Sequence, residues 1–149
     1  MSDIRVNVFG TFAADAERVY RGLVDFTGVQ PRLLPKDARD YRIVTGGVGE
    51  GTVAAFTLPI HGADRDFSFR VAEPIPYRAI TAYDHGHHVT ITWRVRPVAE
   101  TTELDVEIYW TVADARLVIL TQWWASVVLR RMLNQMLGRL PAAIADLVP

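Results

Sequence analysis

Cysteine is absent from the 149 residues. Disulfide bonds, thiolate catalysis and cysteine-ligated zinc are therefore excluded, and stability must come from packing. Lysine is nearly absent too. Lys36 is the only lysine, and the other basic residues counted in the net charge are arginines. The net charge is -1 and no basic stripe is visible, so the chain has little attraction for a phosphate backbone. We expect no nucleic-acid partner.

Long apolar runs are absent as well. The uncharged stretch from Leu117 to Leu129 is interrupted by Gln122 and Ser126 and is shorter than the roughly 18 to 20 residues that a spanning helix needs. The segment from Met1 to Val6 enters a strand pattern directly, without the basic and apolar parts of a signal peptide. We therefore expect a cytoplasmic protein with no integral membrane segment.

The length and composition predict one globular domain over residues 1–149, because 50% of the residues are hydrophobic and 22% are charged. Alternation of apolar and polar residues predicts seven strands. They are Ile4 to Phe12, Tyr41 to Thr45, Thr52 to Leu58, Asp66 to Ala72, Arg78 to Tyr83, Val89 to Val95 and Leu104 to Val112. The breaks between the last six are too short for crossover helices, so we expect an antiparallel meander.

Between the first two strands the sequence predicts a helix and a link. Asp15 is a suitable N-cap, Glu17 suits the positive end of the helix dipole, and the helix should end near Gly28. The segment from Gln30 to Lys36 contains two prolines and predicts a turn-rich link. This places a short helical segment directly after the first strand.

The last third of the chain, Asp114 to Pro149, predicts one long helix with two apolar stripes on nearly opposite sides. The first stripe comprises Leu117, Leu120, Trp124, Val127 and Val128, and the second comprises Leu129, Met132, Leu133, Met136, Leu137 and Leu140. If the second stripe faces the sheet, Gln122 and Ser126 lie over a cavity between sheet and helix. A kink or break near Val128 to Arg131 would instead let both stripes pack inward.

The outward stripe of a straight helix needs a cover, because an apolar patch with a tryptophan is rarely left in water. The candidate interface residues are Leu120, Trp124 and Val127. A homodimer through this stripe is the leading expectation. A covering loop and a membrane surface are the alternatives.

Charge supports a register for the last two strands. If Trp93 and Val106 face inward, Arg94 and Arg96 face outward, opposite the outward carboxylates Glu103, Asp105 and Glu107. Such cross-strand pairs contribute about 0.2 to 1 kcal/mol each, which favours this register over a one-residue slip. We interpret the three carboxylates as solvated partners of arginine and expect no metal site there.

Two motifs suggest chemistry but have simpler explanations. The glycine-rich run from Gly46 to Thr52 continues into a strand, whereas a phosphate-binding loop opens a helix, so a glycine-rich hairpin is favoured. His85, His87 and His88 lie close together, but they fall where two strands must reverse, which favours a polar turn. We therefore expect neither a metal nor a cofactor.

Large aromatic residues at inward positions predict a pocket for a small apolar molecule. Phe67, Phe69, Tyr83, Trp93 and Trp110 are expected on the concave side together with Thr81. The candidate ligand-binding residues are Phe56, Phe67, Phe69, Thr81, Tyr83, Ile91, Trp93, Trp110, Gln122, Ser126, Leu129 and Leu133. Tyr83, Thr81, Gln122 and Ser126 are the polar groups expected to orient the ligand, unless they only satisfy each other or water.

The order of strand, helix, link, six strands and long terminal helix resembles the START-like superfamily, also called SRPBCC. Three local features carry the resemblance: the passage from Ile4 through Phe12-Ala13-Ala14-Asp15 into a helix, the turn Gly49-Glu50-Gly51-Thr52, and the step Ala72-Glu73-Pro74 followed by Tyr77. The resemblance implies an α+β helix-grip fold, in which a curved seven-stranded antiparallel sheet wraps around a long C-terminal helix. It also implies a hydrophobic cavity that relatives use for lipids, quinones, hormones or polyketides, and no universal catalytic residue.

Three functional hypotheses follow. The first is a protein that binds a small hydrophobic molecule between sheet and helix. The second is a polyketide cyclase or dehydratase, for which Tyr83 with Arg42 or His61 are the catalytic candidates. The third is a dimeric or membrane-associated interaction module that uses the outward stripe.

Overall fold

The computed structural model describes residues 2–60, 63–112 and 118–146, and for residues 2, 112 and 118–124 it describes the backbone only. The elements follow in the order β1 (Ser2–Phe12), α1 (Ala16–Leu23), α2 (Gln30–Leu33), β2 (Arg39–Thr45), β3 (Val53–Ile60), β4 (Ala63–Ile75), β5 (Ala79–Asp84), β6 (Val89–Val98), β7 (Thr101–Val112) and α3 (Val118–Ala145). All seven predicted strands are present, and β4, β6 and β7 exceed their predicted lengths the most.

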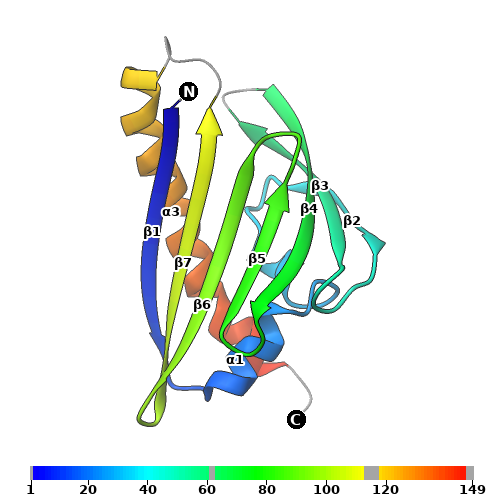
Figure 1. The fold of residues 1–149 in the computed structure, drawn as a ribbon, viewed down its shortest axis with the longest axis vertical. Coiled ribbons are helices and arrows are strands. Elements are labelled where there is room, and N and C mark those ends of the chain that lie inside the picture. The colour runs from blue at the N-terminus through cyan, green and yellow to red at the C-terminus, as the bar shows by residue number, and fades with distance from the viewer. Residues whose placement is uncertain (1, 61–62, 113–117, 147–149) are drawn as a thin grey trace.

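The strands form one antiparallel sheet in the order β1-β7-β6-β5-β4-β3-β2. Consecutive strands are neighbours from β2 to β7, as expected for a meander, and β1 returns to pair with β7 along its whole length. Figure 1 shows the sheet curving around α3, which crosses behind β1 and β7. The predicted α+β helix-grip architecture is confirmed.

The register fixes which side chains face α3. Opposite residues of antiparallel strands share a face, and Val8, Val106, Trp93 and Ile80 form one such row across four strands. All four are buried. We call this side of the sheet the concave face. The charged pairs Arg94–Asp105 and Arg96–Glu103 lie on the other, convex face, so the predicted register of the β6–β7 hairpin is correct.

The second apolar stripe of α3 faces the sheet. Leu129, Leu133, Met136 and Leu140 are buried, whereas Val127 is 50% exposed. The helix continues through Val128 to Arg131 without a break, so the alternative of two stripes packing inward through a break there is not realised. The side chains of Leu120 and Trp124, with which Val127 would form the outward stripe, lie outside the described part of the chain.

The segment between β1 and β2 differs from the prediction. Asp15 caps α1 as expected, since its Oδ1 accepts a hydrogen bond from the Arg18 backbone N–H at 2.8 Å. The helix nevertheless ends at Leu23 rather than near Gly28, and the predicted link contains the short helix α2. Pro31 lies in the first turn of α2, where proline costs no helical hydrogen bond. Both α1 and α2 contact α3, and hydrogen bonds from Arg18 to the Ile144 carbonyl and from Arg139 to the Leu34 carbonyl place these contacts near its C-terminal end.

Candidate functional site

The candidate site lies on the part of the concave face that is only half-buried. Inward residues near the middle of the sheet, such as Trp93 and Val106, are buried, but others nearer one end of the sheet keep contact with solvent. These half-buried apolar residues are Ile43, Leu58, Ile60, Ile91 and Trp110. We call this set the concave site. From α3, Met132 is also half-buried and packs against the same core.

Three stacked phenyl rings lie beside the concave site. Phe56, Phe67 and Phe69 have ring centroids 5.7 to 5.8 Å apart, and all three are buried. Their predicted inward orientation is correct, as it is for Ile91, Trp93 and Trp110. Because the three rings stack on one another, they form an apolar wall beside the site.

Two of the predicted orienting groups point the wrong way. Tyr83 pairs with Arg70, and Thr81 pairs with Ala72, at positions that face the convex side, and Tyr83 is 39% exposed. The phase of β5 is set by Ile80 and Ala82, which face inward opposite Trp93 and Ile91. The large ring of Tyr83 predicts an inward position, but the strand pairing places Ile80 and Ala82 on the concave face and therefore Tyr83 on the convex face.

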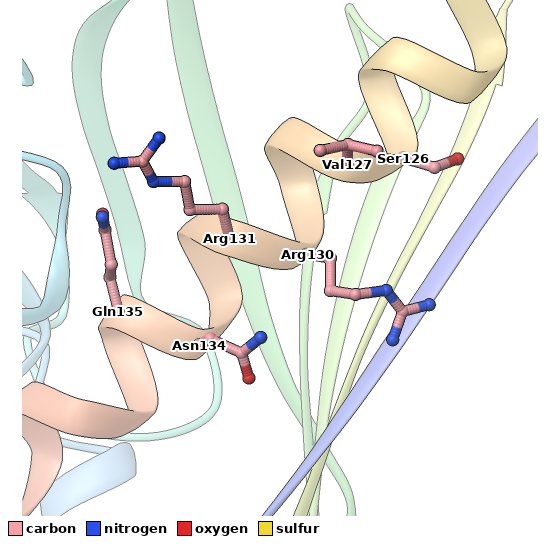
Figure 2. A pocket seen from close by; sticks show the side chains of 6 residues that line it. All are labelled: Ser126, Val127, Arg130, Arg131, Asn134 and Gln135. Carbon is pink, nitrogen blue, oxygen red and sulfur yellow. The ribbon is translucent and has the colours of Figure 1, made fainter.

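Of the two predicted polar groups on α3, the structure describes the side chain of Ser126. The side chain of Gln122 lies outside the described part of the chain. Ser126 is half-buried and lines an open hollow of about 600 Å³ along the helix, together with Val127, Arg130, Arg131, Asn134 and Gln135. Figure 2 shows Arg130 and Arg131 pointing in opposite directions from the helix, so the hollow is a shallow surface and not an enclosed pocket. Leu129 and Leu133 pack in the core, as their inward stripe predicts.

Two of the three catalytic candidates lie on the convex face. Arg42 pairs with Ala55 at a convex position on β2, and its Nη1 donates to the Asp40 carbonyl at 3.0 Å. Tyr83 is on the convex side of β5. His61 lies outside the described residues. Arg42 and Tyr83, the two candidates that the structure describes, therefore both face away from the concave site.

The glycine-rich turn has a structural role. Glu73, at an irregular point of β4, accepts a hydrogen bond from the Glu50 backbone N–H at 2.9 Å and another from the Tyr20 hydroxyl. Burial, reinforced by the bond to Glu73, raises the pKa of Tyr20. The motifs that carry the family resemblance thus join α1, the β2–β3 turn and β4. They hold the sheet and the first helix together and contribute no group to the concave site.

Tyr41 makes stability sensitive to alkali. Its ring stacks on Phe56, its hydroxyl donates to the Phe26 carbonyl, and burial raises its pKa from 10.0 to about 12. Between about pH 10 and pH 12 the unfolded chain loses this proton while the folded chain keeps it, so stability should fall as the pH rises. We expect the free energy of unfolding in urea to decline over this range with a shallower slope in Tyr41→Phe. An equal slope in both proteins would contradict the assignment.

The sequence interpretation missed one polar pair on the concave face. Asp84 is only 2% exposed, and its inward position follows from its pairing with Val89. The Nδ1 atom of His87 lies 3.2 Å from Asp84 Oδ2, and its ring lies 4.5 Å from that of Phe67. His85 instead lies 6.0 Å from the ring of Tyr83. The signal was available in the two-residue period of β5, because an inward Ile80 implies an inward Asp84.

In the residues that the structure describes, no group of three or more metal-ligating side chains is found. None of the described helices is long and apolar enough to cross a membrane.

Neither a protein-family model nor a curated protein sequence matches the chain. Solved structures do. The KanY protein superposes with a TM-score of 0.85 at 22% identity, over 98% of this chain and 100% of that one. A START superfamily protein from Mycobacterium smegmatis gives 0.71 at 18%, over 93% and 97%, and the Zhui aromatase/cyclase from Streptomyces sp. R1128 gives 0.67 at 20%, over 99% and 100%. The chain therefore has the START-like helix-grip fold that its sequence features predicted.

Proposed function

We propose that the protein binds a small hydrophobic molecule at the concave site. The observation that carries the proposal is that five apolar side chains face inward yet remain half-buried. Inward apolar residues are normally covered by packing, and a group of them beside an aromatic wall offers a surface that an apolar ligand can contact. Likeness to a START superfamily protein and to an aromatase/cyclase supports this class of ligand.

Ile91 offers a direct test. It faces inward between Ala82 and Ile108 and is half-buried, so Ile91→Trp should fill space that the ligand needs. We expect the variant to bind 2-methoxynaphthalene, an uncharged apolar probe, at least about tenfold more weakly, which corresponds to about 1.4 kcal/mol. Isothermal titration calorimetry measures the affinity.

Thr92→Trp is the matched control. Thr92 is the next residue of β6 and pairs with Thr81 and Glu107 on the convex face. The same bulk placed there should leave the affinity unchanged. Equal weakening by both variants, or no binding of the probe by the wild-type protein, would contradict the proposal. Native mass spectrometry of protein from its own host then identifies the natural ligand by its mass.

A polyketide cyclase or dehydratase is the alternative function. It needs a titratable group that faces the ligand, and the proximity of His87 to Phe67 is the observation that favours it. Because Tyr83 is on the convex face, Tyr83→Phe should leave both binding and any turnover intact.

We further propose that residues 1–149 act as a single START-like ligand-binding domain, located in the cytoplasm and without a nucleic-acid partner. The near-neutral charge of -1 supports the last point. The exposed Val127 is compatible with the predicted dimer. Sedimentation of Val127→Glu beside the wild-type protein tests it, since an interface through this residue would weaken and lower the measured mass.

A further inference from the structure

We propose that His87, oriented by Asp84 and assisted by Arg65, accepts a hydrogen bond from an acidic hydroxyl group of the bound ligand. The ligand class is an apolar molecule with a hydroxyl on an sp² carbon, as in a phenol or an enol. This inference rests on the proposed function, since it names the polar end of a molecule held at the concave site.

Asp84 is held rigidly where a carboxylate is costly to bury. It is 2% exposed, and its two oxygens accept hydrogen bonds from the Ser68 backbone N–H at 2.9 Å and the His87 backbone N–H at 2.8 Å. A buried carboxylate is tolerated when several donors satisfy it. These bonds close the β5–β6 turn and tie it to β4, so the carboxylate has little freedom to move.

The remaining contact of Asp84 orients the imidazole. A carboxylate oxygen can only accept, so Nδ1 of His87, 3.2 Å away, is the nitrogen that carries the proton. In the neutral ring this leaves Nε2 as an acceptor. Among the described residues Nε2 has no partner, and no side-chain nitrogen or oxygen there is both buried and unpaired. The Nε2 lone pair is therefore open to solvent or to a ligand.

The position of the ring places this lone pair beside the apolar site. His87 packs against Phe67 at 4.5 Å between centroids, and Phe67 belongs to the stacked wall next to the concave site. A carboxylate that fixes the tautomer of a histidine next to an apolar surface is the arrangement by which proteins orient a proton acceptor.

Arg65 adds a positive charge at the same end of the sheet. It pairs with Leu58 at a concave position of β4, two residues before Phe67, which places the two Cα atoms roughly 7 Å apart on one face. Within the described residues it is exposed and has no hydrogen bond or ion pair. A cation beside a proton acceptor favours a hydroxyl that carries partial negative charge, which distinguishes a phenol or enol from an aliphatic alcohol.

Two naphthalenes of nearly equal shape separate this inference from the proposed function. 2-Naphthol can donate a hydrogen bond and 2-methoxynaphthalene cannot. We expect the wild-type protein to bind 2-naphthol about tenfold more tightly, the contribution of one well-placed hydrogen bond. His87→Phe, which keeps a ring against Phe67, should reduce this preference to about one. Arg65→Gln should lower the preference in part.

Matched controls come from the same turn and strand. His85→Phe and Arg70→Gln alter residues that accompany Tyr83 on the convex side, so neither should change the preference. In the wild-type protein, addition of 2-naphthol should shift the ¹⁵N signal of His87 Nε2. Asp84→Asn should change the tautomer balance that the same spectrum reports.

The outcomes are distinct. Tight binding of both probes without a preference, a preference that survives His87→Phe, or a His87 signal that 2-naphthol does not move would each overturn the inference and leave the proposed function standing. Failure of 2-methoxynaphthalene to bind would remove both.

Discussion

Leu133→Ala should lower the free energy of unfolding by about 2 to 5 kcal/mol, the range for removing a large buried aliphatic side chain. Leu133 is fully buried, at 0% exposure, in the stripe of α3 that faces the sheet. The loss includes the transfer of the side chain and a cavity between α3 and β1, the strand on which the helix mainly packs. Urea denaturation monitored by circular dichroism measures it.

Val128→Ala on the same helix is the control. Val128 is exposed, so its truncation removes little buried surface and should change stability by no more than about 0.5 kcal/mol. If Leu133→Ala is equally mild, the helix does not depend on this stripe for its attachment.

The fold was predictable from the sequence because its signals are periodic and locally consistent. The charges of Arg94 and Arg96 specify the register of the β6–β7 hairpin, and the second stripe of α3 specifies the buried side of the helix. Both patterns separate residues that must contact solvent from residues that must be buried. Errors of a few residues at α1 and α2 arose where short helices depend on tertiary contacts rather than on period.

The candidate site was predicted less well because Asp84, a charged residue of a type that is usually exposed, is buried there. Tyr83 was placed inward because it is large and aromatic, whereas Asp84 is the residue that faces inward. A carboxylate is buried only where hydrogen-bond donors satisfy it. The donors of Asp84 are two backbone N–H groups and an imidazole, and the sequence does not show that the fold brings them to it. The sequence also does not predict which histidine of the turn lies near which face, because this depends on the same tertiary contacts. His87 lies against Phe67 on the concave face, and His85 lies near Tyr83 on the convex face.

The two ends of β4 have different roles, one in holding the fold together and one at the concave site. At one end, Glu73 ties the strand to α1 and to the glycine turn through Tyr20 and the Glu50 backbone N–H. At the other end, Arg65 and Phe67 face the concave site near His87. A change at Glu73 should therefore affect stability without altering ligand preference. A change at Arg65 should alter ligand preference with little effect on stability, because this side chain is exposed.

Gly49→Ala should destabilise the protein through two separate effects. Gly49 has a φ of 69°, in the left-handed region, and a residue with a side chain there costs about 1 to 3 kcal/mol. The added Cβ would also lie 2.7 Å from Glu73 Oε2, the oxygen that accepts from the Glu50 backbone N–H. Pushing this carboxylate away weakens its bonds, at a further cost of about 1 to 3 kcal/mol.

Substitutions at two other glycines separate the backbone effect from the contact with Glu73. Gly51 has a φ of 89°, and a Cβ added there would meet no atom within 4 Å, so Gly51→Ala should show the backbone cost alone. Gly138 lies within α3 with free space around it, and Gly138→Ala should stabilise the protein by about 0.5 to 1 kcal/mol through helix propensity. Thermal and urea unfolding of the three variants should therefore rank Gly49→Ala lowest. If Gly49→Ala and Gly51→Ala lose equal stability, the contact with Glu73 contributes nothing and the turn is held by its backbone alone.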